Sequence, residues 1–245
     1  MKTTVKGLPE LLERLHTTEA TTIKQEVQAF LRTLNPQDLV IAEQAFVDAG
    51  LNPGDIHHLC SAHLELFGDA ATQLKQHLPD DHVIRIMLEE HDVLLAILNE
   101  LEALNESIQH QEYLSSIDIQ HLRGIAQQLL DAEPHHQREE QVLFVEVEKR
   151  GLFGPPQVMT LEHEELRTRK RALLNLITVA TQIDTQEFKH ALNTIASILV
   201  LTLRDHILKE NNILYPAALQ TIPDAAVWQD MKEKCDRIGY CRFMR

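Results

Sequence analysis

The chain has 245 residues with 23 Lys or Arg, 37 Asp or Glu and 14 His, for a formal net charge of −14. That charge disfavours a broad phosphate-binding surface, so we expect no nucleic acid partner. No apolar run reaches the roughly 18 residues of a membrane span, and the first residues lack a signal peptide's apolar core. Three cysteines (Cys60, Cys235 and Cys241) are too sparse for a disulfide framework. We therefore expect a cytoplasmic protein with no membrane partner.

The composition and the first third of the chain predict helices. Only 8 Gly, 9 Pro and 4% aromatic residues favour an all-α fold. Apolar residues recur at helical spacing, and Asn35-Pro36 and Asn52-Pro53 mark helix starts. The stretch 77–81 breaks this pattern and offers Asp80 or Asp81 as an N-cap. We expect a small helical domain of unknown function over residues 1–78.

Longer helices follow the break. The apolar periodicity predicts four of them, over residues 82–107, 116–149, 156–181 and 184–220. Pro134 must kink or split the second, and residues 151–156 form a loop. Short connections between long helices indicate an up-down-up-down four-helix bundle over residues 79–221. A C-terminal helical tail, residues 222–245, carries an amphipathic stretch around Trp228.

Two matching histidine patterns occur within the bundle. In the second and fourth helices a His is followed by Glu at +4, Leu at +8 and an aromatic residue at +9; these are His135, Glu139, Leu143 and Phe144, and His206, Glu210, Leu214 and Tyr215. The first and third helices instead share a Glu-His dipeptide, Glu90-His91 and Glu162-His163. Its His precedes the His of the following helix by 44 and 43 residues. The bundle thus reads as two copies of one helical hairpin.

This repeat predicts a metal site. Residues i and i+4 share one helix face, so two packed hairpins would bring four His and two Glu into the bundle core. Buried carboxylates are costly unless a metal compensates them, and imidazole with carboxylate suits iron, manganese or zinc. The alternative is histidines on solvated helix faces, which the spacing alone would allow. A second register, His136 with Glu140, is also open, but only His135 with Glu139 matches the fourth-helix copy.

With these motifs, residues 82–220 resemble the hemerythrin-like, HHE cation-binding domain. The resemblance implies a four-helix bundle with a non-haem di-iron centre, two iron ions that zinc or manganese could replace. It implies as ligands His91, His135, His163 and His206, with Glu139 and Glu210 as bridging carboxylates. Typical hemerythrins have a second His four residues after the third-helix ligand, where this chain has Arg167, and many relatives have Pro where it has Val145. With Arg167 at that place one iron would lack a ligand and have an additional open position, which argues against reversible oxygen carriage.

The chain ends carry weaker signals. The first third resembles a module of unknown function that precedes such domains in bacterial proteins, through residues 11–16, 42–44 and 59–63. In longer relatives a sensory domain follows the segment resembling residues 238–241, so sensory output here would need a partner or the N-terminal module. Cys60 and His63 could share a metal or respond to oxidants, but two ligands make a weak site, and a packed Cys beside a surface His is the simpler explanation. His57 and His58 could add ligands, but a solvated helix start explains them as well, and a surface role at a helix start suffices for His82. Cys235 and Cys241 are expected to be flexible, unpaired thiols.

We therefore expect a metal-binding protein that binds or senses O2, NO or peroxide, with iron handling as a related role. The expected partner is a small diatomic ligand or peroxide, and a homodimer or a signalling partner is an open alternative. Two other functions remain open: a di-iron enzyme (oxidase, peroxidase or NO-processing protein), and a zinc-bound or metal-free structural or interaction module. Fold and ligand set do not fix the chemistry.

Overall fold

The structure is a computed structural model that describes residues 6–14, 26, 29–30, 42, 45 and 70–244. The two weak N-terminal sites, Cys60 with His63 and His57 with His58, lie outside the described residues. The two Asn-Pro helix starts of the first third lie outside them as well. The described residues form helices, turns and loops and contain no strand.

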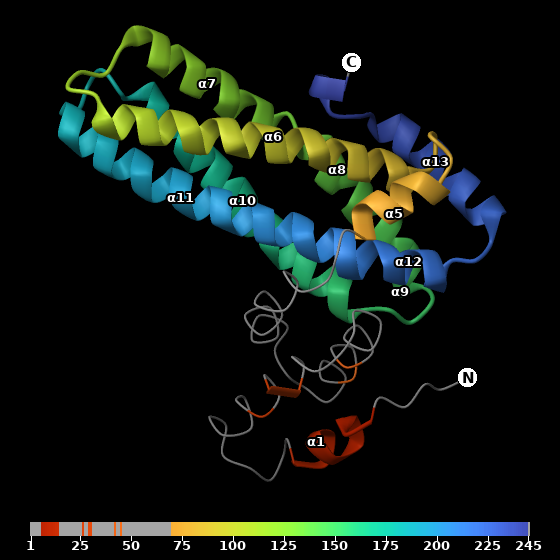
Figure 1. Cartoon of the computed structure of the whole chain (residues 1–245). Helices are drawn as coiled ribbons and strands as arrows, with labels where there is room; N and C mark the ends of the chain where they lie inside the picture. Colours follow the sequence, from red (N-terminus) through yellow and green to blue (C-terminus); the bar gives the residue numbers. More distant parts are fainter. Residues whose placement is uncertain are drawn as a thin grey trace.

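A four-helix bundle makes up most of the described chain (Figure 1). Its first arm is α6 (Val83–His110), and its third is α10 (Gly154–Thr178). The second arm is divided into α7 (Ser116–Leu130), α8 (Glu133–Arg138), η1 (Glu139–Leu143) and α9 (Phe144–Glu148). The fourth consists of α11 (Thr185–Lys209), η2 (Glu210–Leu214) and α12 (Tyr215–Thr221). Successive arms run in opposite directions, so the expected all-α up-down-up-down bundle is confirmed.

The second arm breaks where the sequence predicts. Pro134 lacks an N–H group and lies in the first turn of α8, after α7 has ended at Leu130. Beyond α8 the chain enters η1, a π-helical turn, and η2 is the corresponding π turn of the fourth arm. π turns are rare and are frequent at functional sites. Here each begins at a Glu of the repeated pattern, Glu139 or Glu210.

The start of α6 differs from the expectation that Asp80 or Asp81 caps it. These two residues form a turn after Pro79, whose carbonyl accepts from the His82 N–H at 3.0 Å. The helix therefore begins later, and His82 is its N-cap, with Nδ1 accepting from the Ile84 N–H at 3.2 Å. His82 also packs on Trp228, with ring centroids 4.6 Å apart, so it has a structural contact in addition to its place at the helix start.

The apolar core is divided into two parts along the bundle. On α6, Ile84 and Met87 belong to one buried cluster and Leu94 and Leu98 to the other. The polar pair Glu90-His91 lies between these clusters on the same helix. Each fully buried aliphatic side chain contributes about 1.5–3 kcal/mol. The two apolar clusters thus provide the stability that lets the bundle accommodate polar residues at its centre.

The fourth arm, Thr185–Thr221, is one continuous helical stretch. Among the described residues it is the stretch that is long and apolar enough to cross a membrane by length and composition. In the bundle it packs against α6 and α10.

Two further helices, α5 (Ala70–His77) and α13 (Ala225–Ile238), close one end of the bundle (Figure 1). Gly239 has φ of +98°, a conformation that favours glycine, and turns the chain back towards α6. Cys235 and Cys241 are unpaired, as expected, and both are buried, whereas the sequence suggested flexible thiols. They are buried because α13 and the turn after it press them against the bundle.

Candidate metal centre

The six predicted ligands converge from all four arms. They are His91 on α6, His135 on α8, Glu139 at the start of η1, His163 on α10, His206 on α11 and Glu210 at the start of η2. Each side chain is at most 1% exposed. The structure therefore brings together every residue that the sequence repeat selects.

The four histidines form two pairs. The Nε2 atoms of His91 and His135 are 3.0 Å apart, and those of His163 and His206 are 3.1 Å apart. Each pair joins one lone His with one His of the His-x-x-x-Glu pattern. Two Nε2 atoms this close can serve neighbouring coordination positions of a single ion, so the site contains two such positions.

Glu210 connects the two positions. One of its carboxylate oxygens lies 3.1 Å from Nε2 of His91, and the other lies 2.9 Å from Nε2 of His206. The carboxylate is fully buried, and neither oxygen receives a hydrogen bond of good geometry. The charges of His206 and of the other facing histidines outweigh the effect of burial and hold the pKa of Glu210 well below its ordinary value.

Glu139 connects the positions in the same way. Its Oε2 lies 3.3 Å from Nε2 of His163 and 3.5 Å from Nε2 of His135, and has no hydrogen-bond partner. Its other oxygen accepts from the Tyr215 hydroxyl at 2.8 Å. A buried carboxylate without donors costs several kcal/mol unless a cation compensates it. The donor set of four imidazoles and two carboxylates thus fits a pair of metal ions.

The Nδ1 atoms of these histidines face outward to fixed oxygen partners. His135 pairs with Glu90 at 2.7 Å, His206 with Glu162 at 2.7 Å, His91 with Asn211 at 2.7 Å and His163 with Glu140 at 2.8 Å. A histidine that donates through Nδ1 keeps its Nε2 lone pair for a metal, and such outer partners orient metal-binding imidazoles. Glu90 and Glu162 belong to the repeated Glu-His dipeptides, so the sequence repeat already indicated a shared role for them.

Buried cations hold two of these outer carboxylates. Arg138 donates to Glu90 at 2.6 Å, and Lys209 donates to Glu162 in the corresponding place. Burial alone would raise the pKa of Glu90, but the His135 hydrogen bond and the Arg138 charge lower it to about 2. The Cys241 N–H donates to Glu90 as well, at 3.2 Å. The carboxylate is thus ionised throughout the physiological range.

The two halves of the site follow a pseudo-twofold relation, with equivalent residues 71 or 72 positions apart. The pairs are Glu90 and Glu162, His91 and His163, His135 and His206, Arg138 and Lys209, and Glu139 and Glu210. The relation breaks where Tyr215 corresponds to Phe144. The Tyr215 hydroxyl lies 3.4 Å from Nε2 of both His91 and His135, whereas the Phe144 ring stacks on His163 with centroids 5.8 Å apart. The surroundings of the two histidine pairs therefore differ chemically.

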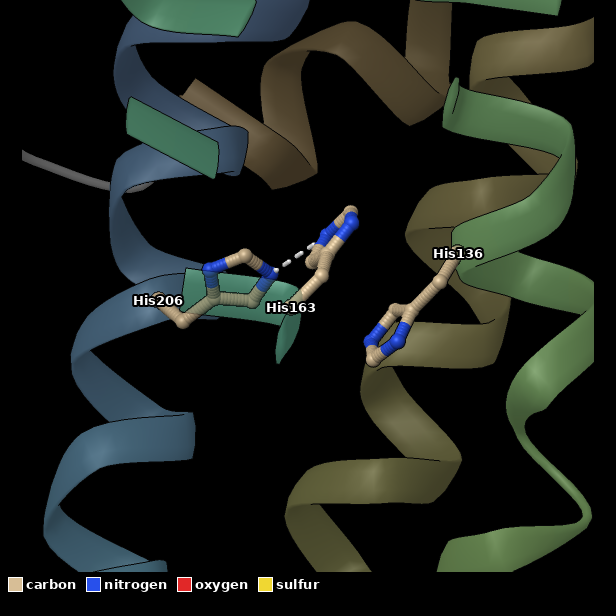
Figure 2. A group of neighbouring side chains, drawn as sticks. All are labelled: His136, His163 and His206. Carbon is tan, nitrogen blue, oxygen red and sulfur yellow. Dashed lines mark hydrogen bonds between the residues drawn. The ribbon is translucent and has the colours of Figure 1, made fainter. Parts of the chain in front are cut away.

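His136 is a seventh residue of the cluster. It is 1% exposed, and its ring stacks parallel to that of His163 with centroids 4.0 Å apart (Figure 2). Burial, together with the positive charge of neighbouring groups, lowers its pKa well below the ordinary value. Of the two glutamates that follow, Glu139 faces the cluster, whereas Glu140 contacts His163 from outside and pairs with Arg167 at 2.9 Å.

Two cations on α10 follow His163. Arg167 stands where typical hemerythrins have a second His, and it binds Glu133 and Glu140 at 2.9 Å each. Lys170 is buried, and desolvation lowers its pKa to about 8. In place of another imidazole, the α10 side of the site therefore has a guanidinium neutralised by two carboxylates and a buried ammonium group.

The comparisons with known proteins agree with this geometry. Residues 82–218, more than half of the chain, match the hemerythrin HHE cation binding domain. Residues 8–73 match the Family of unknown function (DUF438), so the likeness of the first third to a module of unknown function is confirmed. No curated protein matches the chain. With its buried His and Glu clusters and this match, the chain belongs to the hemerythrin HHE cation-binding family.

Proposed function

We propose that the six residues hold a dinuclear iron centre that binds or senses a small oxygen-related ligand: O2, NO or peroxide. The observation that carries the proposal is the pairing of Nε2 atoms, 3.0 and 3.1 Å apart, with two buried carboxylates that each face both pairs. His91 and His135 would hold one ion, and His163 and His206 the other. Glu139 and Glu210 would be shared.

The ligand types favour iron. Imidazole with carboxylate is typical of iron, manganese and zinc sites and poorly suited to calcium or copper(I). Iron would supply reversible electron transfer and an affinity for small oxygen and nitrogen ligands. We place the protein in the cytoplasm, where its two unpaired buried thiols, Cys235 and Cys241, would stay reduced.

The chain's own residues would prepare this chemistry. Glu90, Glu162, Glu140 and Asn211 orient the four imidazoles and fix the protonated nitrogen on the outside. The two apolar clusters on either side shield the site from water, which strengthens electrostatic interactions inside it.

The test is metal analysis together with visible absorption spectra of the anaerobically reduced protein before and after O2 is added. We expect about two iron ions per chain, and the loss of at least one in Glu139→Ala and in His206→Ala. His121→Ala is the control, since His121 is half-exposed on α7, where it bonds Glu100 at 2.6 Å. Full iron content in both ligand variants would refute the assignment. Zinc or no metal would favour a structural module, and substrate-dependent turnover would favour an enzyme.

A further inference from the structure

The pseudo-twofold relation breaks at a second place, His136. Its counterpart 71 residues on is Ile207, an apolar side chain that is 2% exposed. This additional imidazole stacks on His163, with its ring centroid 4.0 Å away, and lies edge-on to His206 and to His135 of the other pair at 6.0 and 6.1 Å. The three rings converge from α8, α10 and α11 (Figure 2), and one ligand-type nitrogen from each lies within 4.8 Å of the others.

His136 is placed beside this metal position but is not oriented to coordinate the ion. Its ring plane is within 9° of that of His163, and the ring centroids are 4.0 Å apart. Because an imidazole binds a metal in its own ring plane, two parallel stacked rings cannot both direct a nitrogen to the same ion. His163 could therefore hold an ion without His136 among its ligands, and His136 would remain beside that position.

A buried ring nitrogen of His136 is left without a hydrogen bond. Its Nδ1 is buried and has no hydrogen-bond partner, and the nearest carboxylate oxygen, on Glu133, lies 4.0 Å away. Glu133 is itself bound to Arg167 at 2.9 Å. Buried polar atoms are nearly always paired, so this side chain has free hydrogen-bonding capacity for a ligand.

The surroundings favour a small anion. The position has two imidazoles and two shared carboxylates, and Arg167 stands where the family usually supplies a third imidazole. Lys170 lies on the same side of α10, buried, and its charge acts on His136. At the other position, the Tyr215 hydroxyl already lies 3.4 Å from both histidine nitrogens. The open side, beside the buried ammonium group of Lys170, is therefore that of His163 and His206.

We propose that a small anionic ligand binds the metal ion held by His163 and His206, and that His136 donates a hydrogen bond to that ligand. The proposal rests on the proposed function, because it requires a metal at this position. In this role His136 is a positioning residue that recognises the ligand, and the site is asymmetric although the ligand set is symmetric.

The experiment uses azide as the probe on the oxidised, iron-loaded full chain. His136→Phe keeps the stacked ring and removes both nitrogens, whereas His136→Gln restores a donor without the ring. We expect His136→Phe to keep both iron ions, to bind azide at least 10-fold more weakly in a visible-absorption titration, and to lose the D2O-induced shift of the bound-azide vibration. His136→Gln should recover part of both signals. His121→Phe, the same change at a half-exposed site, should match the wild type.

Every other result refutes either the role of His136 or the proposed function. Loss of one iron in His136→Phe would make His136 a ligand and refute the hydrogen-bonding role. Unchanged azide affinity and an unchanged isotope shift, or a wild-type protein that binds two irons but no azide, would refute the inference and leave the di-iron assignment intact. A wild-type chain without iron would refute the proposed function itself. If His136→Phe does not fold, as judged by circular dichroism, the isotope shift in His136→Gln decides.

Discussion

The Nδ1 atom of His135 donates a hydrogen bond of 2.7 Å to Glu90, and both side chains are buried. This bond fixes which nitrogen of the imidazole is free to bind a metal. The ring orientation of His135 therefore depends on a residue outside the six predicted ligands.

Replacing Glu90 should weaken metal binding at that position. Glu90→Gln keeps the shape but removes the charge that supports the His135 imidazole, and loss of such an outer partner typically costs 10–100-fold in affinity. Competition with a chelator should show one of the two ions leaving first. Glu100→Gln is the matched control, because Glu100 makes the same kind of bond to the half-exposed His121. Equal loss of both ions in Glu90→Gln would contradict the pairing of His91 with His135.

Arg138 stabilises the bundle through the charge of Glu90. Arg138→Met leaves a buried carboxylate unpaired, so the free energy of unfolding should fall by about 3–5 kcal/mol. Urea denaturation at pH 7 measures this, and the double variant Glu90→Gln with Arg138→Met should lose less. The pKa of Glu90 is lowered to about 2 in the folded chain. Its contribution to stability is therefore present above about pH 4.5 and is lost as the pH falls towards 2. Additive losses in the double variant would show that the pair is not coupled.

Replacing Lys170 should stabilise the chain, whereas replacing Arg138 should destabilise it. Its buried ammonium group has a pKa lowered to about 8, so at pH 7 the folded state holds a charge at a cost. Lys170→Met should raise the free energy of unfolding by about 2 kcal/mol at pH 7. Between pH 8 and 10.5 the folded chain has released this proton and the unfolded chain has not, so the free energy of unfolding of the wild type rises with pH. The difference between Lys170→Met and the wild type should therefore become smaller over this range. A gain that is the same at pH 7 and 9.5 would show that Lys170 is not charged in the folded state.

Acid should release the metals before it unfolds the chain. Burial alone would lower the pKa of His163, but its contacts with Glu139, Glu140 and Glu210 raise it well above the ordinary value. The pKa of His206 is also raised, by the Glu210 charge acting against burial. Protons therefore compete with metal from above pH 6.5, and affinity should fall steadily as the pH is lowered. Metal retained after dialysis at stepped pH, with circular dichroism alongside, measures this. Simultaneous loss of metal and helicity would refute the expected order.

The sequence predicted through its repeat that six His and Glu side chains converge in the bundle core, because residues i and i+4 share a face whatever the packing. It did not predict the place of His136. That place depends on how α8 enters the bundle after the break at Pro134, which a local pattern does not contain. The burial of Cys241 likewise depends on the Gly239 turn, which returns the tail to Glu90. Glu90 and Glu162 were recognisable in the sequence as repeated Glu-His dipeptides, but only the folded hairpins show which imidazole each carboxylate binds.

The two π turns explain a spacing that an ordinary helix would not permit. In both halves an aromatic residue follows the shared Glu by five positions, Glu139 to Phe144 and Glu210 to Tyr215, and the aromatic N–H bonds the carbonyl of that Glu. A bond from i+5 to i brings the aromatic ring over the Glu, whereas in an α-helix it would point to another side. Deleting one residue within either turn would restore α-helical bonding and rotate the aromatic side chain away from the centre. The length of each turn is therefore as much a part of the site as the residues that line it.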